Sequence, residues 1–111
     1  MISGAHVMIF TEDEAADRAF LRDVLEIPCI DSGGGWLIFK LPPAELGVHS
    51  GKNGFHQIYF ICDDVDRFVE AMAAKGVATQ PTSEESWGRS TGVTLPGGGI
   101  LGIYEAHHAR P

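Results

Sequence analysis

The sequence predicts a small α+β protein built from two tandem β-α-β-β-β units. The observation that carries this prediction is a near repeat, because residues 4–10 (Gly-Ala-His-Val-Met-Ile-Phe) return as residues 54–60 (Gly-Phe-His-Gln-Ile-Tyr-Phe). An acidic stretch that is typical of a helix start follows each copy, with Asp13 matched by Asp63. Each copy therefore opens one half of the molecule.

The ends of the two halves also correspond. Residues 46–49 (Leu-Gly-Val-His) match residues 101–104 (Leu-Gly-Ile-Tyr). A half of this length buries too little surface to be stable alone, so the halves must pack on each other or on a second chain. We expect a single domain over residues 1–111, with internal repeats at about 4–50 and 54–106.

The first half contains one predicted helix between predicted strands. Residues 5–10 are apolar on both sides of a period-two alternation, which is typical of a strand covered on both faces. Thr11 and Glu14 form a capping-box pattern, and the helix that they start cannot continue through Pro28. Three short strands are expected near residues 29–31, 36–41 and 45–49.

The second half follows the same plan. A strand is expected over residues 55–61, and a helix from about 63 to 75 has apolar residues at three-four spacing. Gly76 provides a left-handed C-cap for that helix. Three further strands are expected near residues 77–80, 87–95 and 100–105.

Composition limits the partners and the compartment. The chain has 15 acidic against 8 basic residues, which excludes nucleic acid as a partner and favours a small neutral or cationic ligand. Cys29 and Cys62 lack metal-binding or redox spacing, so we interpret both as buried apolar residues of a reduced, cytoplasmic protein. The start of the chain does not resemble a signal peptide, and no stretch is long enough to span a bilayer.

Residues 4–106 resemble the vicinal oxygen chelate superfamily, which contains glyoxalase I, extradiol dioxygenases, fosfomycin-resistance enzymes and bleomycin-resistance proteins. The resemblance rests on the tandem plan, the histidine near the start of each half, and the stretches at 87–89 (Trp-Gly-Arg) and 95–98 (Leu-Pro-Gly-Gly). It implies mixed sheets that curl around a cavity. It also implies that the units pair within one chain or are swapped between the two chains of a homodimer.

Two histidines are candidate metal ligands. His6 and His56 occupy equivalent places in the repeat of residues 4–10 and 54–60, and in the resembled family these positions commonly carry metal ligands. The family's acidic ligand falls on Gly102 here, so a third imidazole from His49, or the carboxylate of Glu45, or that of Glu105 after a shift of register, would have to complete the site. The alternative is that each histidine is hydrogen-bonded and lines an apolar pocket.

The leading functional hypothesis is an enzyme of lyase, isomerase or dioxygenase type that acts on a small substrate with adjacent oxygens. Nickel, zinc, iron or manganese would stabilise an oxyanion or activate dioxygen, with His6, His56 and Glu105 as ligands. Tyr104 or His49 would move a proton nearby.

The alternative hypothesis is a metal-free protein that sequesters a drug or metabolite, as the bleomycin-resistance members do. An aromatic-lined cup in an acidic protein suits a flat or cationic molecule. The candidate ligand-binding residues are Phe10, Phe60, Trp87 and Arg89.

Overall fold

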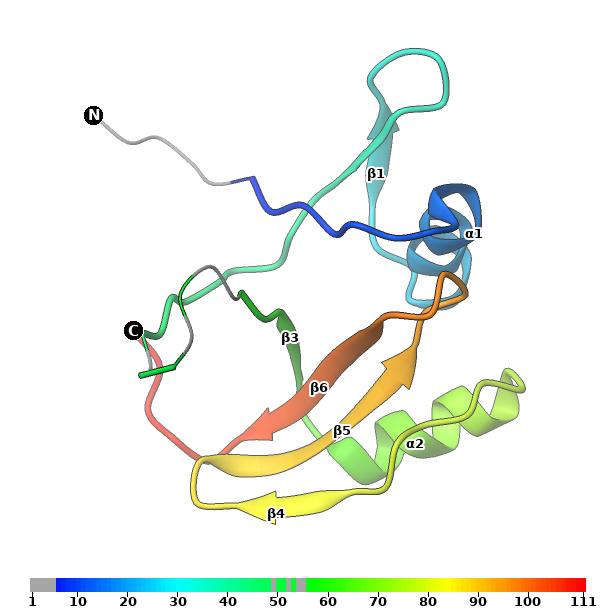
Figure 1. Ribbon diagram of the computed structural model, residues 1–111. Helices are drawn as coiled ribbons and strands as arrows, with labels where there is room; N and C mark the ends of the chain where they lie inside the picture. Colours follow the sequence, from blue (N-terminus) through cyan, green and yellow to red (C-terminus); the bar gives the residue numbers. More distant parts are fainter. Residues whose placement is uncertain (1–5, 49, 52, 54–55) are drawn as a thin grey trace.

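The computed structural model describes residues 6–48, 50, 51, 53 and 56–111, and its elements form two sheets and two helical segments (Figure 1). The smaller sheet pairs β1 (Cys29–Asp31) with β2 (Leu37–Phe39) in antiparallel fashion. The larger sheet has the strand order β3-β6-β5-β4. Its strands are β3 (Tyr59–Cys62), β4 (Ser83–Glu85), β5 (Gly88–Thr94) and β6 (Ile100–Ala106).

The larger sheet is mixed, because β3 runs parallel to β6 whereas β4, β5 and β6 are antiparallel neighbours. The strand predicted near residues 77–80 forms later, as β4, and only Thr79 makes an isolated bridge to Val93. The reason is the tight turn at Ser86 and Trp87, which fixes the register of β4 on β5 from Glu85 and Gly88 onward.

Both helices begin with an aspartate cap. Helix α1 (Glu14–Ala19) continues as the π-helical turn η1 (Phe20–Val24), and the Asp13 side chain accepts a hydrogen bond from the Ala16 amide. The predicted cap Thr11 instead accepts from the Asp13 amide at 3.3 Å, so the helix begins two residues later than predicted. Helix α2 (Val65–Ala74) is capped by Asp64, and Gly76, two residues beyond its end, has a φ of 72°, which confirms the predicted left-handed C-cap.

The core lies between the larger sheet and the two helical segments. Its buried apolar side chains come from η1, α2, β5 and β6 and the turn after β5, and comprise Phe20, Met72, Val93, Leu95, Leu101 and Ile103. Along β6, Leu101 and Ile103 are each 2% exposed and face the helices, so period-two alternation directs Gly102 and Tyr104 to the opposite face. We call this opposite face, which carries Tyr59, Ser90, Gly102 and Tyr104, the open face.

The first half differs from its prediction at two segments. Residues 6–10 and 45–48, which were expected to be strands, are irregular, and residue 49 lies outside the described part of the chain. Phe10, Leu46 and Val48 are 91%, 91% and 95% exposed. In the second half, the corresponding segments pair as β3 and β6. In the first half, residues 6–10 and 45–48 do not pair with each other.

Cys29 and Cys62 are both free and half-buried, so they are less buried than predicted. Partial burial raises the pKa of the Cys62 thiol, which keeps it protonated and apolar in character. In the part of the chain that the structure describes, no helix has the length and apolar character to cross a membrane.

Candidate ligand-binding site

Three aromatic rings meet on the open face and form the most distinctive site of the structure. Tyr59 comes from β3, Trp87 from the turn between β4 and β5, and Tyr104 from β6. The ring centroids lie 5.1 Å apart for Trp87 and Tyr104, 5.7 Å for Tyr59 and Tyr104, and 6.0 Å for Tyr59 and Trp87, all edge to face. Tyr59 and Trp87 remain 39% and 37% exposed. We call these three residues the aromatic cluster.

Two glycines make room for the aromatic cluster. A Cβ atom at Gly102 would collide with the Tyr59 ring, which therefore lies directly over the β6 backbone. A Cβ atom at Gly88 would collide with the carbonyl oxygen of Glu105 and would lie 3.3 Å from the Tyr104 ring. Gly102, at the position of the family's acidic ligand, thus allows an aromatic ring to pack where a carboxylate was expected.

Polar atoms surround the aromatic cluster. The Gln57 side-chain amide donates to the Tyr59 hydroxyl at 3.1 Å. The Tyr104 hydroxyl is hydrogen-bonded to His108 Nε2 at 2.9 Å, and the two rings are tilted by 31° with centroids 5.8 Å apart. The cluster therefore offers apolar ring surface beside hydrogen-bonding groups, a combination that is common in small-molecule sites.

The helix caps change the alignment of the two halves near the candidate metal ligands. Asp13 caps α1 and Asp64 caps α2, so the residue seven positions before the cap is His6 in the first half and Gln57 in the second. His56 is exposed and precedes β3, and the parity of the strand places it with Ile58 and Phe60 on the helix side. The residues that line the cavity around His6 do not include His56.

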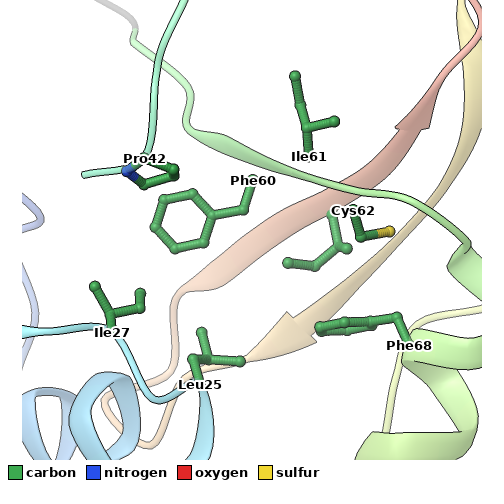
Figure 2. A pocket seen from close by; sticks show the side chains of 8 residues that line it. Leu25, Ile27, Pro42, Phe60, Ile61, Cys62 and Phe68 are labelled. Carbon is green, nitrogen blue, oxygen red and sulfur yellow. The ribbon is translucent and has the colours of Figure 1, made fainter. Parts of the chain in front are cut away.

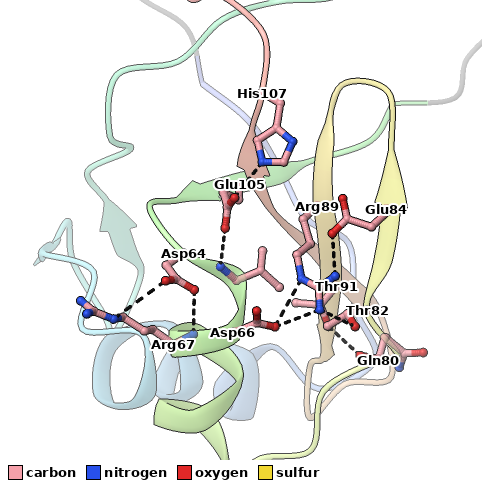
Figure 3. A network of polar contacts seen from close by, with 11 residues as sticks. Asp64, Asp66, Arg67, Gln80, Thr82, Glu84, Arg89, Thr91, Glu105 and His107 are labelled. Carbon is pink, nitrogen blue, oxygen red and sulfur yellow. Dashed lines mark hydrogen bonds and ion pairs between the residues drawn. The ribbon is translucent and has the colours of Figure 1, made fainter.

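Glu105 faces the helices and is engaged there (Figure 3). Its Oε1 accepts from the Val65 amide at the start of α2 at 3.1 Å, and its Oε2 is hydrogen-bonded to His107 Nε2 at 2.7 Å. The hydrogen bond with His107, followed by that from Val65, lowers the pKa of the Glu105 carboxyl group. The regular register of β5 on β6 keeps this carboxylate on the side of the sheet opposite Tyr104.

Because Glu105 is hydrogen-bonded in its ionised form, we expect the free energy of unfolding to fall in acid. Because its pKa is lower in the folded than in the unfolded chain, ionised Glu105 stabilises the fold at neutral pH. This contribution is lost as the pH falls from the unfolded-state pKa through the lowered folded value. We expect Glu105→Gln to reduce the urea midpoint at neutral pH and to flatten its decline in acid. The matched variant Glu70→Gln, at an exposed site on α2, should leave both unchanged.

Arg89 also lies on the helix side of the sheet (Figure 3). Its guanidinium contacts Asp66 of α2 at 3.0 Å and Glu84 of β4 at 2.6 Å, and donates to the Thr82 hydroxyl at 3.2 Å. These contacts raise the pKa of Arg89 and tie β5 to its neighbours. The guanidinium is thereby directed away from the aromatic cluster.

The remaining candidates divide between two cavities. His6, Phe10 and Phe60 line a hollow of about 460 Å³ between the N-terminal segment, α1, β2 and β3. Phe60 also lines a smaller apolar cavity of about 200 Å³ with residues that include Leu25 and Phe68 (Figure 2). His49 lies outside the described residues, and Glu45 forms a two-pronged ion pair with Arg110 at 2.6 and 2.8 Å.

Sequence reasoning missed Tyr59, Gln57 and His108. The pairing of Tyr59 with Gly102 depends on the register of β3 on β6, which the repeat does not specify. The sequence contains no signal that brings His108 back to Tyr104, because this contact depends on the path of the chain after β6.

Known proteins are similar to this chain in structure rather than in sequence. No family model and no curated protein matches the sequence. Among solved structures, the antibiotic-binding protein TnmS3 from Streptomyces sp. CB03234 is similar with a TM-score of 0.68 and 18% identity, over 96% of this chain and 99% of that chain. The chain therefore shares the fold of glyoxalase/bleomycin-resistance-type structures, and the α+β fold class predicted from the sequence is confirmed.

Two further vicinal oxygen chelate structures belong to proteins of other functional classes. The lactoylglutathione lyase from Agrobacterium tumefaciens has a TM-score of 0.64 and 20% identity, over 92% of this chain and 94% of that chain. The fosfomycin resistance protein FosX from Listeria monocytogenes has a TM-score of 0.62 and 22% identity, over 96% and 95%. At these identities the likeness shows the fold and does not choose between the functions.

The resemblance to the vicinal oxygen chelate proteins implies a divalent metal, and the donor groups of the described residues, which do not include His49, do not fit one. Among the described residues, no three His, Cys, Asp or Glu side chains are grouped so that they could hold an ion. Glu105 is held by Val65 and His107.

Proposed function

We propose that this protein binds a small, flat, aromatic molecule on the aromatic cluster and releases it unchanged. The observation that carries the proposal is the exposure of Tyr59 and Trp87, at 39% and 37%, beside a third ring on one face of a sheet. Exposed rings in contact with each other form a surface on which a planar ligand can stack.

The surroundings of the cluster set the character of the ligand. Gln57, Tyr104 and His108 place hydrogen-bonding groups beside the rings, which would orient a ligand that carries polar substituents. The net charge of −7 favours a neutral or cationic ligand over an anionic one. The similar protein TnmS3 binds an antibiotic, which is in keeping with this proposal.

The test is a binding titration with two probes, the planar cationic dye proflavine and bleomycin. We expect Trp87→Ala to weaken proflavine binding by about tenfold or more, because stacking on one aromatic side chain is worth about 1–3 kcal/mol. The matched control is Ile30→Ala, which removes an apolar side chain that is 69% exposed, lies in the other half of the chain and lines neither cavity. Isothermal titration calorimetry measures both variants, and equal losses in the two would contradict a site at the aromatic cluster.

A metal arm distinguishes this proposal from a metal-dependent enzyme. Purified protein is analysed for metals and titrated with nickel, zinc, iron and manganese, with His6→Ala as the comparison variant. Binding without a metal predicts no stoichiometric uptake and the same proflavine affinity in His6→Ala. Stoichiometric uptake that is abolished by His6→Ala would instead support the enzyme hypothesis.

We further infer that the chain forms a homodimer in the cytoplasm. Three large apolar side chains, Phe10, Leu46 and Val48, are more than nine-tenths exposed on the two unpaired segments of the first half. Apolar surface of this kind is typical of a protein–protein contact. The two free cysteines suit a reducing compartment.

A further inference from the structure

The hollow beside the N-terminal segment is separate from the aromatic cluster. It is bounded by the N-terminal segment, α1, β2 and β3, and its volume of about 460 Å³ lies within the range typical of small-molecule sites. Its walls are mostly apolar and include Trp36, Phe39 and Phe60. Phe60 lies on the helix side of the larger sheet whereas Tyr59 lies on the open face, so the sheet divides the two sites.

A buried carboxylate with an unused acceptor lines this hollow. Asp17 of α1 is 5% exposed, and its Oδ1 accepts from the Gly97 amide at 2.7 Å. Its Oδ2 is buried and has no hydrogen-bond partner among the described residues. Burial of an unpaired polar atom costs free energy, so native structures seldom leave one without a role.

The cationic side chain next to Asp17 in the lining, Arg18, is engaged elsewhere. The guanidinium of Arg18 lies 4.9 Å above the centre of the Trp36 ring, and its nearest carboxylate contact is Glu14 at 3.9 Å. Gly97 lies so close that a Cβ atom there would collide with the Thr11 hydroxyl and meet both Asp17 oxygens at 3.1 Å. The turn after β5 therefore covers Asp17 on one side, and Asp17 also lines the hollow.

We propose that the hollow is a second ligand site, which takes a small molecule with an apolar body and a protonated amine that donates to Asp17 Oδ2. The apolar walls would hold the body, and the amine would supply the hydrogen bond and the positive charge that Asp17 lacks. Glu14 and Asp17 together outnumber the single Arg18 in the lining, which also favours a cation.

The experiment compares tryptamine with 3-ethylindole, which has the same ring but no amine, by calorimetry on the full chain. We expect tryptamine to bind about tenfold or more tightly, and Asp17→Asn to abolish that preference, because hydrogen bonds to charged groups are worth about 1.5–3 kcal/mol. The asparagine can keep its acceptor for Gly97 but presents an NH₂ group in place of Oδ2. Glu14→Gln, at an exposed carboxylate of the same lining, should change the affinity by less than about twofold.

Two further measurements keep the proposal falsifiable. If Asp17→Asn does not fold, the Gly97 amide resonance of the wild type should shift with tryptamine but not with 3-ethylindole. Trp87→Ala should leave the preference for tryptamine over 3-ethylindole unchanged, because this preference depends on Asp17 and not on the aromatic cluster. Equal affinity for the two probes overturns the proposal, and so does tryptamine binding that disappears when the protein dimerises, since a second copy would then fill the hollow.

Discussion

Gly88→Ala is expected to lower the free energy of unfolding by about 3 kcal/mol or more, at the upper end of the usual cost of overpacking. The added methyl group would collide with the backbone carbonyl oxygen of Glu105 on the neighbouring strand. Gly88 pairs with Ala106 at the end of the β5–β6 ladder, so this collision cannot be relieved by moving one flexible side chain. The strands would have to separate beside Trp87 and Tyr104.

Thermal unfolding measures this effect, and a drop in Tm of roughly 10–20 °C corresponds to it in a chain of this size. Gly99→Ala is the matched control, because a Cβ atom at Gly99 would meet nothing within 4 Å. Its Tm should stay within about 4 °C of the wild type. A Gly88→Ala variant as stable as Gly99→Ala would show that β5 and β6 do not approach each other this closely.

The second half could be predicted from the sequence because its local signals and its partners agree. The apolar spacing of α2, its aspartate start and Gly76 each specify the same helix, and β5 and β6 follow one another across a glycine-rich turn. In the first half the alternation of residues 6–10 predicts a strand, but a pattern shows only that a segment can form a strand. Whether it does depends on a partner, and residues 45–48 do not provide one within the chain.

In the candidate site too, a sequence pattern does not show which partner or which face a residue takes. Period-two alternation predicts that Glu105 and Tyr104 lie on opposite faces of the sheet, and the regular register of β5 on β6 agrees. The equivalence of His6 and His56 depended on which of two adjacent aspartates caps α2, which the sequence alone does not settle. Arg89 lies beside Trp87 in the sequence, yet its side chain points to the other face because neighbouring residues of a strand alternate.

Leu101→Ala is expected to lower the free energy of unfolding by about 3 kcal/mol, within the usual range for truncation of a buried leucine. Leu101 is 2% exposed and packs in the core between β6 and the helices. Its counterpart in the first half is Leu46, which is 91% exposed. The two leucines therefore offer the same substitution at a buried and an exposed position, and urea unfolding of dilute protein should show almost no loss for Leu46→Ala.

Leu46→Ala should act on assembly instead. If the unpaired segments of the first half meet a second copy, Leu46 is buried on dimerisation, and in a twofold interface it is buried twice. Burial of one leucine side chain is worth about 1.5–3 kcal/mol, so the two copies together contribute about 3–6 kcal/mol, and the dimer dissociation constant should rise on the order of 100-fold or more. Sedimentation equilibrium measures this constant. Leu101→Ala is the comparison variant, because it lowers the folding stability of the single chain and not the affinity between two chains. A wild-type chain that remains monomeric at every concentration would leave Leu46 exposed to water and contradict the proposed homodimer.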